Sequence, residues 1–207
     1  MAPLREIDPN GIYHVMSRGN FRQVVFVDDD EFVRYTQLLQ RVTLRRRWVV
    51  LDWCLIPNHV HLVIQLTEGG LSDGMRDLNG GFSRWHNART GRTGTGHLWK
   101  NRFKHLDLED DVHFKEVLRY VPANPVRHGL VRHSEDWPWS GYRATIGLEY
   151  PFAFHRPAEL LRYFGARRDE AVRRYRHFVH EGLVRSGHPV GQTKVTNHAQ
   201  LMVESHA

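Results

Sequence analysis

The sequence predicts an α+β domain whose antiparallel sheet follows the ferredoxin-like order β-α-β-β-α-β, with helices on one face and a C-terminal helical extension. Two observations lead to this fold class. Four short segments rich in Val, Ile, Leu and Trp have the alternating or continuous apolar pattern of strands. Between them, two longer segments carry apolar residues at the i, i+3, i+4 spacing of helices, which gives the split βαβ order.

The first half of the chain contributes one strand, one helix and a hairpin. Residues 12–17 alternate apolar and polar side chains and predict the first strand. The aspartates at 28–30 can cap a helix whose apolar stripe runs to Val42. Residues 48–56 and 59–66 predict two strands that are close enough, across a Pro-Asn turn, to pair as an antiparallel hairpin.

The second half contributes the remaining helix and strand, followed by a helical region. Ser72 is predicted to cap a helix that carries large apolar side chains up to Trp85. Residues 98–108 contain the fourth strand, and the aspartates at 110–111 cap a further helix. Residues 169–183 predict a late helix with an apolar face and several arginines around it.

The composition favours a nucleic-acid partner. The chain has 207 residues and a formal net charge of +6, and only four of its 29 basic residues are Lys. Arg suits bidentate contacts to phosphate, although a basic proteome from a GC-rich genome would give the same bias. The single cysteine, Cys54, excludes a disulfide framework and a Cys-based zinc site. We expect a cytoplasmic protein with no membrane partner, because no leader or membrane-spanning stretch is recognisable.

Two histidines in one predicted strand are the first candidates for a functional site. His59 and His61 flank a single valine, and side chains alternate between the faces of a strand, so both imidazoles point to the same face. Such a pair can hold a divalent metal ion. Two ordinary histidines, hydrogen-bonded within the core, would give the same pattern.

A tyrosine and an asparagine on the following helix are the next candidates. Tyr120 and Asn124 are four residues apart, so they lie on one face of the helix. If this helix crosses the sheet face that bears the histidines, the hydroxyl and the amide oxygen converge on the imidazoles. A divalent ion there would polarise a phosphodiester, and the tyrosine would attack phosphorus to form a covalent phosphotyrosine. The spacing alone also fits a tyrosine that only packs its ring.

Five separated segments match one known family in the family's own order. They are residues 13–20, 58–63, 96–104, 119–127 and 139–143. Together they span residues 11–146, and on them the chain resembles the REP-associated tyrosine transposases, a branch of the single-tyrosine HUH transposases in the IS200-like superfamily. Several matches in order are far more specific than the histidine pair alone.

The resemblance implies a function and residue roles. It implies a site-specific single-stranded DNA endonuclease and strand transferase that uses Mg²⁺ or Mn²⁺ and acts, as a monomer or homodimer, on REP hairpins with an adjacent short tag. His59 and His61 match the metal-binding histidines, and Tyr120 matches the nucleophile that forms a 5′-phosphotyrosine. Asn124 matches a third metal ligand. Pro122 departs from the family pattern and would remove one helix hydrogen bond just before Asn124.

Two segments beside the predicted active site supply candidates for DNA contact. After the first strand, basic and amide side chains could read the tag, although a turn that satisfies its own backbone would look the same. Before and within the fourth strand, basic and aromatic side chains could contact DNA, with an exposed basic face as the alternative. The candidates are Arg18, Asn20, Arg22, His97, Trp99, Arg102 and Lys104.

The sequence predicts three parts of the chain and leaves two rival functions. Residues 1–150 would form an HUH transposase-like catalytic domain, residues 151–185 a helical extension packed on it, and residues 186–207 a flexible tail. In the first rival function, the same fold binds structured DNA as a regulator without cutting it. In the second, a metal hydrolase cleaves with an activated water molecule in place of the tyrosine.

Overall fold

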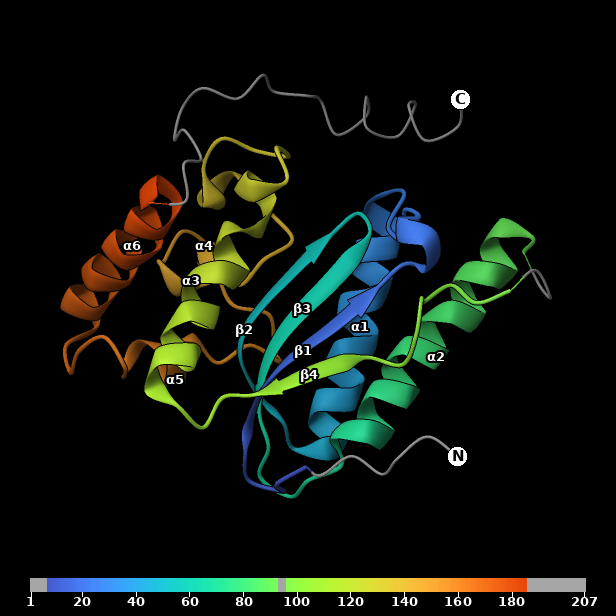
Figure 1. The fold of residues 1–207 in the computed structure, drawn as a ribbon, viewed down its shortest axis with the longest axis horizontal. Helices are drawn as coiled ribbons and strands as arrows, with labels where there is room; N and C mark the ends of the chain where they lie inside the picture. Colours follow the sequence, from blue (N-terminus) through green and yellow to red (C-terminus); the bar gives the residue numbers. More distant parts are fainter. Residues whose placement is uncertain (1–6, 93–95, 186–207) are drawn as a thin grey trace.

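A four-stranded antiparallel sheet lies at the centre of the computed structural model, which describes residues 7–92 and 96–185 (Figure 1). The strand order is β2-β3-β1-β4, and every neighbouring pair is antiparallel. The predicted fold class is therefore confirmed. The strands are β1 (Ile12–Arg18), β2 (Val49–Ile56), β3 (His59–Gln65) and β4 (Lys104–Asp107). Within the segment predicted to contain the fourth strand, the continuous pairing with β1 is limited to Lys104–Asp107, and Trp99 forms an isolated bridge with Gly19.

The central strands β1 and β3 divide their side chains between two faces of the sheet. Tyr13 and Val15 of β1 are fully buried in the hydrophobic core. His14 and Met16 point to the opposite face, and Met16 pairs directly with His61 of β3. The histidines of two adjacent strands therefore share one face of the sheet.

Two long helices, α1 (Asp29–Arg46) and α2 (Leu71–Thr90), cover the face away from the histidines (Figure 1). The side chain of Asn79 on α2 donates to the Ser17 hydroxyl of β1 at 2.7 Å. Ser17 points to the same face as Val15, which assigns α2 to that side. This arrangement leaves the histidine face free for another element.

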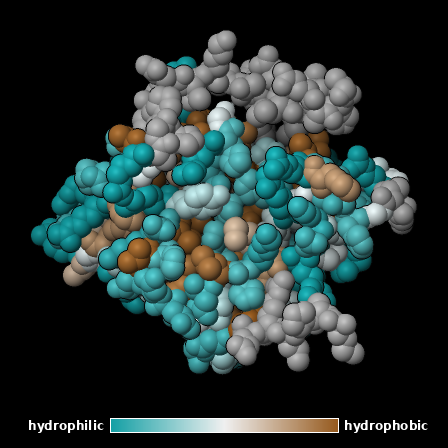
Figure 2. All heavy atoms as spheres, in the orientation of Figure 1, coloured by the Kyte–Doolittle hydropathy of each residue, from teal (hydrophilic) through white to brown (hydrophobic). Residues whose placement is uncertain are grey.

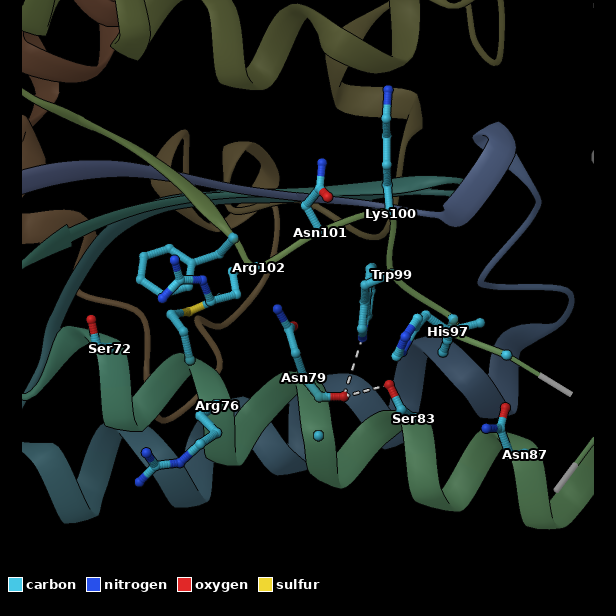
Figure 3. A pocket seen from close by; sticks show the side chains of 15 residues that line it. Ser72, Arg76, Asn79, Ser83, Asn87, His97, Trp99, Lys100, Asn101 and Arg102 are labelled. Carbon is cyan, nitrogen blue, oxygen red and sulfur yellow. Dashed lines mark hydrogen bonds between the residues drawn. The ribbon is translucent and has the colours of Figure 1, made fainter. Parts of the chain in front are cut away.

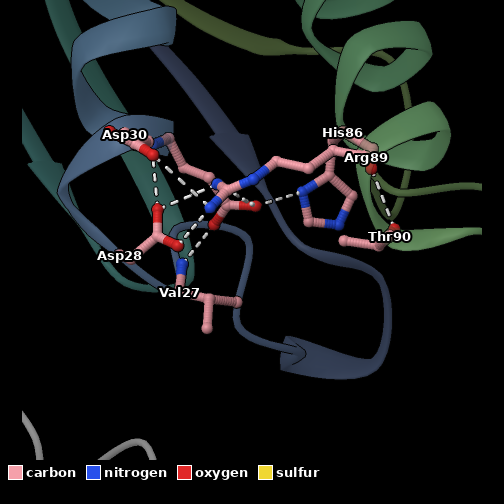
Figure 4. Close-up of polar contacts among 7 residues, drawn as sticks. Val27, Asp28, Asp30, His86, Arg89 and Thr90 are labelled. Carbon is pink, nitrogen blue, oxygen red and sulfur yellow. Dashed lines mark hydrogen bonds and ion pairs between the residues drawn. The ribbon is translucent and has the colours of Figure 1, made fainter.

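Charged side chains join the start of α1 to the end of α2 (Figure 4). Arg89 of α2 donates to the Asp28 carboxylate at 2.9 Å. Beneath this pair, the His86 ring lies 2.8 Å from the Glu31 carboxylate, and both side chains are almost fully buried. The pairing fixes how the two crossover helices lie relative to each other.

The two helices begin in different ways. The Asp28 side chain accepts a hydrogen bond from the Glu31 N–H, as the sequence predicted for α1. In α2 the residue before the helix is Gly70, which adopts a left-handed conformation with φ of 77° and supplies no side-chain cap. The predicted Ser72 cap is therefore wrong, because a glycine that tolerates positive φ lets the helix begin at Leu71.

The helix α3 (Asp111–Arg127) begins after Asp110 and packs against β2 and β3, on the histidine face. The two crossover helices lie on one face as predicted, but α3 does not join them. Pro122 and Pro125 both lie inside this helix. Pro125 cannot donate to the Val121 carbonyl, and the Asn124 amide donates there instead at 3.4 Å and to the Tyr120 carbonyl at 2.9 Å. The helix therefore continues through both prolines.

A C-terminal group of helices packs on α3 and on the outer side of β2. It consists of η2 (Ser134–Asp136), α4 (Tyr142–Thr145), α5 (Pro157–Leu161) and α6 (Arg168–Arg185). α6 contacts α3 and α5, and the Tyr175 hydroxyl of α6 donates to the buried Asp52 carboxylate of β2 at 3.3 Å. The observed α6 extends slightly beyond the predicted 169–183, and the predicted tail at 186–207 lies outside the described residues.

The outer edge of β2 is covered by backbone contacts from this C-terminal region. The N–H of Leu55 donates to the Trp139 carbonyl at 2.9 Å. Farther along the strand, the N–H of Arg156 donates to the Val50 carbonyl at 2.9 Å. β2 is thus an edge strand of the sheet whose free groups are paired with segments from much later in the chain.

None of the helices in the described part of the chain is long and apolar enough to cross a bilayer. On the face drawn in Figure 2, hydrophobic residues form separate groups among hydrophilic ones.

Candidate active site

The predicted histidine pair and tyrosine come together where α3 crosses the ends of β1 and β3. The ring centroids of His59 and His61 are 4.8 Å apart, and those of His61 and Tyr120 are 5.3 Å apart. All three residues line one cavity of about 370 Å³. The convergence expected from the sequence is therefore present in the geometry.

Asn58 orients the imidazole of His59. The Nδ1 atom of His59 lies 2.6 Å from the Asn58 amide oxygen. Because that oxygen can only accept, the proton must sit on Nδ1, and Nε2 keeps a free lone pair. The Asn58 amide nitrogen donates in turn to the Arg22 carbonyl at 3.4 Å. A backbone carbonyl thus fixes the asparagine, and the asparagine fixes the ring.

His14, which the sequence analysis did not select, orients His61. Its Nε2 atom lies 2.9 Å from Nδ1 of His61, and the two rings stack at a centroid distance of 5.1 Å. The His61 Nε2 atom is buried and has no hydrogen-bond partner in the structure. Both paired histidines can therefore present Nε2 as an acceptor. The signal that could have identified His14 is the alternation of β1, but its use requires the register with β3.

The electrostatics keep these imidazoles neutral near pH 7. Burial, with smaller effects from the nearby His128 and Arg18, lowers the pKa of His59 to about 3. Burial also lowers the pKa of His14 to about 4 and that of His61 well below its ordinary value. A neutral imidazole is the form that coordinates metal ions.

Asn124 supplies an unpartnered oxygen next to the same rings. Its side chain is fully buried, and its amide nitrogen donates to backbone carbonyls of α3. Its Oδ1 atom lies close enough to His59 to oppose the lowering of that pKa, yet it has no hydrogen bond of acceptable geometry. A buried acceptor without a donor is costly unless an external group satisfies it.

The donor set fits a divalent cation. Two imidazole nitrogens and one amide oxygen are present; imidazole suits ions such as Zn²⁺ and Fe²⁺, while the amide oxygen and open positions for water also admit Mg²⁺ and Mn²⁺. No three His, Cys, Asp or Glu side chains of the described residues form a metal-binding group by themselves. The amide oxygen of Asn124 would therefore be needed as the third ligand beside His59 and His61.

Tyr120 stands at the junction of two cavities. It is partly exposed, its ring lies near His14, and the Arg127 guanidinium lies 5.3 Å from its centroid. A second cavity of about 430 Å³ between α3 and α6 shares Tyr120 and is lined by three arginines, Arg119, Arg127 and Arg185. Sequence reasoning placed arginines around the late helix but could not show that Arg185 lines the same cavity as Tyr120.

The predicted DNA-contact residues fall into three groups. Arg18, Arg102 and Lys104 line the cavity of the histidines. Asn20 and Arg22 lie in the adjoining turn η1 (Asn20–Arg22), which follows β1. The remaining two, His97 and Trp99, line a neighbouring cavity, and the structure does not bring them into the histidine cavity.

That neighbouring cavity lies between α2 and the segment that leads to β4 and has a volume of about 740 Å³ (Figure 3). Trp99 points toward α2, where its indole N–H donates to the Asn79 carbonyl at 3.1 Å. Lys100 points away from α2 and also lines the histidine cavity. Trp99 is 8% exposed, so most of its ring is occupied in packing. Asn101 and Arg102 line both cavities as well, so the two are contiguous.

Comparisons with known proteins identify one family of transposases. Residues 9–124 match the family described as IS200-like transposase. A REP-associated tyrosine transposase of Escherichia coli is 27% identical over 109 residues, which is 51% of this chain and 61% of that protein. A Haemophilus influenzae protein assigned to the same group is 31% identical over 108 residues, 47% of this chain and 61% of its own length. The matched part of the chain thus spans about three fifths of each relative.

A solved structure has the same fold. It is a REP-associated tyrosine transposase bound to a REP hairpin, with a TM-score of 0.56 and 22% sequence identity. The match covers 75% of this chain and 98% of the other. At this identity the likeness establishes the common fold.

Proposed function

The chain belongs to the IS200-like transposases, and from that premise we propose that it is a metal-dependent, site-specific endonuclease and strand transferase for single-stranded DNA. Its substrate would be a REP-type hairpin with an adjacent short single-stranded tag. One observation carries the proposal. Tyr120 lies against the ring of His61, which is paired with His59, and Arg18, Lys100, Arg102 and Lys104 line the same cavity. The unpartnered oxygen of Asn124 lies next to His59.

In the proposed reaction, the Tyr120 hydroxyl loses its proton and attacks the scissile phosphorus. The new bond joins the tyrosine oxygen to phosphorus, and the bond from phosphorus to the 3′ oxygen breaks. The 5′ segment leaves with a free 3′-hydroxyl, and the other segment remains attached as a 5′-phosphotyrosine. The reverse attack by a 3′-hydroxyl would then join a new end.

His59, His61 and Asn124 would hold the divalent cation, and Asn58 and His14 would keep the two rings in position. When bound, the cation would neutralise charge that develops on the oxygens of the scissile phosphate. The residues themselves are arranged before any ligand arrives, because each ring already has a fixed hydrogen bond on its Nδ1 atom.

The charges around the site support a path for DNA. Three cavities adjoin one another. Lys100 and Arg102 line both the cavity beside α2 and the histidine cavity. Tyr120 lines both the histidine cavity and the cavity between α3 and α6. Arg119, Arg127 and Arg185 extend the basic lining beyond the tyrosine. A phosphate backbone could therefore follow the arginines and lysines across the reactive centre.

Formation of a covalent adduct tests the proposal. The full chain is incubated with Mn²⁺ and hairpin DNA that carries single-stranded flanks, and a protein–DNA adduct is expected on a denaturing gel. Tyr120→Phe should abolish the adduct, since only the nucleophilic oxygen is lost. Tyr150→Phe is the matched control, because Tyr150 is 96% exposed and does not line the cavities.

The two rival functions give different results in the same assay. A non-cleaving regulator would bind the hairpin and leave it intact with any metal. A hydrolase with activated water would cut the DNA without an adduct, and Tyr120→Phe would retain most of that cleavage. An adduct that persists in Tyr120→Phe would show that another residue is the nucleophile.

A further inference from the structure

The turn η1 contains backbone strain at two consecutive residues. Phe21 and Arg22 are consecutive non-glycine residues with φ of 49° and 62°. The left-handed region is unfavourable for residues with a Cβ atom, and a large aromatic residue is uncommon there. Strain of this kind persists only where the surrounding structure enforces it, and it clusters at functional sites.

Hydrogen bonds from two neighbouring segments enforce this conformation. The N–H of Gly19 donates to the Asn58 carbonyl at 2.9 Å, and the N–H of Asn20 donates to the Leu98 carbonyl at 2.9 Å. The side chain of Gln23 donates to the same Leu98 carbonyl at 3.0 Å. The turn is therefore held between the β2–β3 connection and the segment that leads to β4.

Phe21 is the side chain that this rigid turn presents to solvent. It is 93% exposed, so its ring is not used in the core. Arg18 and Arg22 lie on either side of it in sequence, and Arg18 lines the cavity of the histidines. An exposed apolar ring that is close in sequence to two arginines favours a partner that combines a flat apolar surface with negative charge.

The turn is also connected directly to the candidate catalytic centre. Asn58 donates to the Arg22 carbonyl at 3.4 Å and accepts from His59 at 2.6 Å. The carbonyl of Arg18 accepts from the Lys100 N–H at 2.8 Å, and Lys100 lines the same cavity as His59. Hydrogen bonds therefore join the turn that carries Phe21 to residues next to and within the histidine cavity.

We propose that Phe21 is a stacking platform for one unpaired nucleobase of the single-stranded segment next to the scissile phosphodiester. Every base has a π-face, so an exposed aromatic ring can hold it, while adjacent arginines hold the phosphates. Because hydrogen bonds already hold the turn, little backbone freedom is lost on binding. This inference rests on the proposed function, because it assumes that single-stranded DNA crosses the site.

The test measures DNA binding and base stacking separately from cleavage. Hairpins with and without a single-stranded extension carry the fluorescent base 2-aminopurine at successive extension positions. Wild-type protein should change the fluorescence of one position strongly, and Phe21→Ala should lose that change. Affinity for the extended hairpin should fall between about 5-fold and about 150-fold, and affinity for the blunt hairpin should stay the same.

Two further variants make the result specific. Phe21→Trp keeps an aromatic ring and should retain the fluorescence change, whereas Tyr150→Ala removes an equally exposed ring elsewhere and should behave as wild type. Unchanged affinity and fluorescence in Phe21→Ala would overturn the inference. Stacking by wild type without any covalent adduct would instead refute the proposed cleavage chemistry and leave the platform standing. Failure of wild type to bind either hairpin would refute both.

Discussion

Asp52 provides a quantitative test of the packing between the sheet and the C-terminal helices. Its carboxyl is fully buried, and it accepts hydrogen bonds from the Trp53 N–H at 2.8 Å and from the Tyr175 hydroxyl at 3.3 Å. Burial raises its pKa from 3.8 to about 7, because two neutral donors only partly replace the lost water. These values differ by about 3, and each pKa unit corresponds to about 1.4 kcal/mol, so the effect on stability is about 4 kcal/mol.

The direction in which stability changes with pH follows from the raised pKa of Asp52. The folded-state pKa is raised, so the stability that the protonated carboxyl contributes is fully present below about pH 4 and is lost as pH rises to about 7. Asp52→Asn removes this dependence. The variant should be less stable than wild type at about pH 4 by roughly 1–3 kcal/mol, because its amide N–H₂ lacks an acceptor. At about pH 8 the order should reverse, since the wild type then holds a buried charge.

Urea unfolding at a series of pH values measures this difference. The free energy of unfolding of wild type minus that of Asp52→Asn should fall by about 4 kcal/mol between about pH 4 and about pH 8. Tyr175→Phe removes one donor to the carboxylate, which should raise the pKa of Asp52 further. In that variant the free energy of unfolding should therefore continue to fall at higher pH. A difference between wild type and Asp52→Asn that stays constant with pH would refute the reasoning.

Three further predictions concern the metal site, the packing of α2 and the arginine-lined cavity between α3 and α6. Asn58→Ala frees the ring of His59 and should weaken Mn²⁺ binding by about 10- to 100-fold in calorimetry; equal affinity would contradict the orienting role. Gly74→Ala places a Cβ atom 2.2 Å from the buried Trp48 ring and should reduce stability by about 1–3 kcal/mol. Gly81→Ala, with only ordinary contacts, should stabilise the same helix by up to about 1 kcal/mol, and equal effects would exclude the clash. Arg185→Ala should weaken binding of all DNA sequences and reduce the salt dependence by about 0.7–0.9 in slope; an unchanged slope would remove Arg185 from the DNA path.

The fold was largely predictable because its signals are local. The capping aspartate before α1, the apolar stripes of the helices and the two central strands all follow from short-range patterns. The start of α2 was not predictable from Ser72, because Gly70 adopts a backbone conformation that the pattern of apolar residues does not reveal. The sequence does not determine the sheet face on which α3 packs, because that face depends on tertiary contacts.

The site was predictable where residues are close in sequence or match the family. His59, His61 and Tyr120 were selected and lie together in the structure, and their chemical roles stay predictions. His14 was missed because its relation to His61 depends on the register between two strands. Arg185 was missed as a site residue because only the packing of α6 on α3 brings it near the tyrosine.

Pro125 and Asn124 show how a proline can be accommodated inside a helix. The proline leaves the Val121 carbonyl without its usual donor, and the amide of Asn124 takes over that position. The same hydrogen bonds turn the amide oxygen toward the imidazoles. The proline that precedes them, Pro122, therefore does not prevent Asn124 from reaching the site.

The paired outer edge of β2 limits how far this chain can be shortened without exposing the edge of the sheet. The family match ends at residue 124, but the backbone groups that cover β2 belong to Trp139 and Arg156. A fragment that stopped at the family boundary, or even at residue 150, would leave part of this strand open to pairing with a strand of another molecule. The later segments thus cover an edge that could otherwise pair with another strand, and we expect a shortened chain to aggregate more readily.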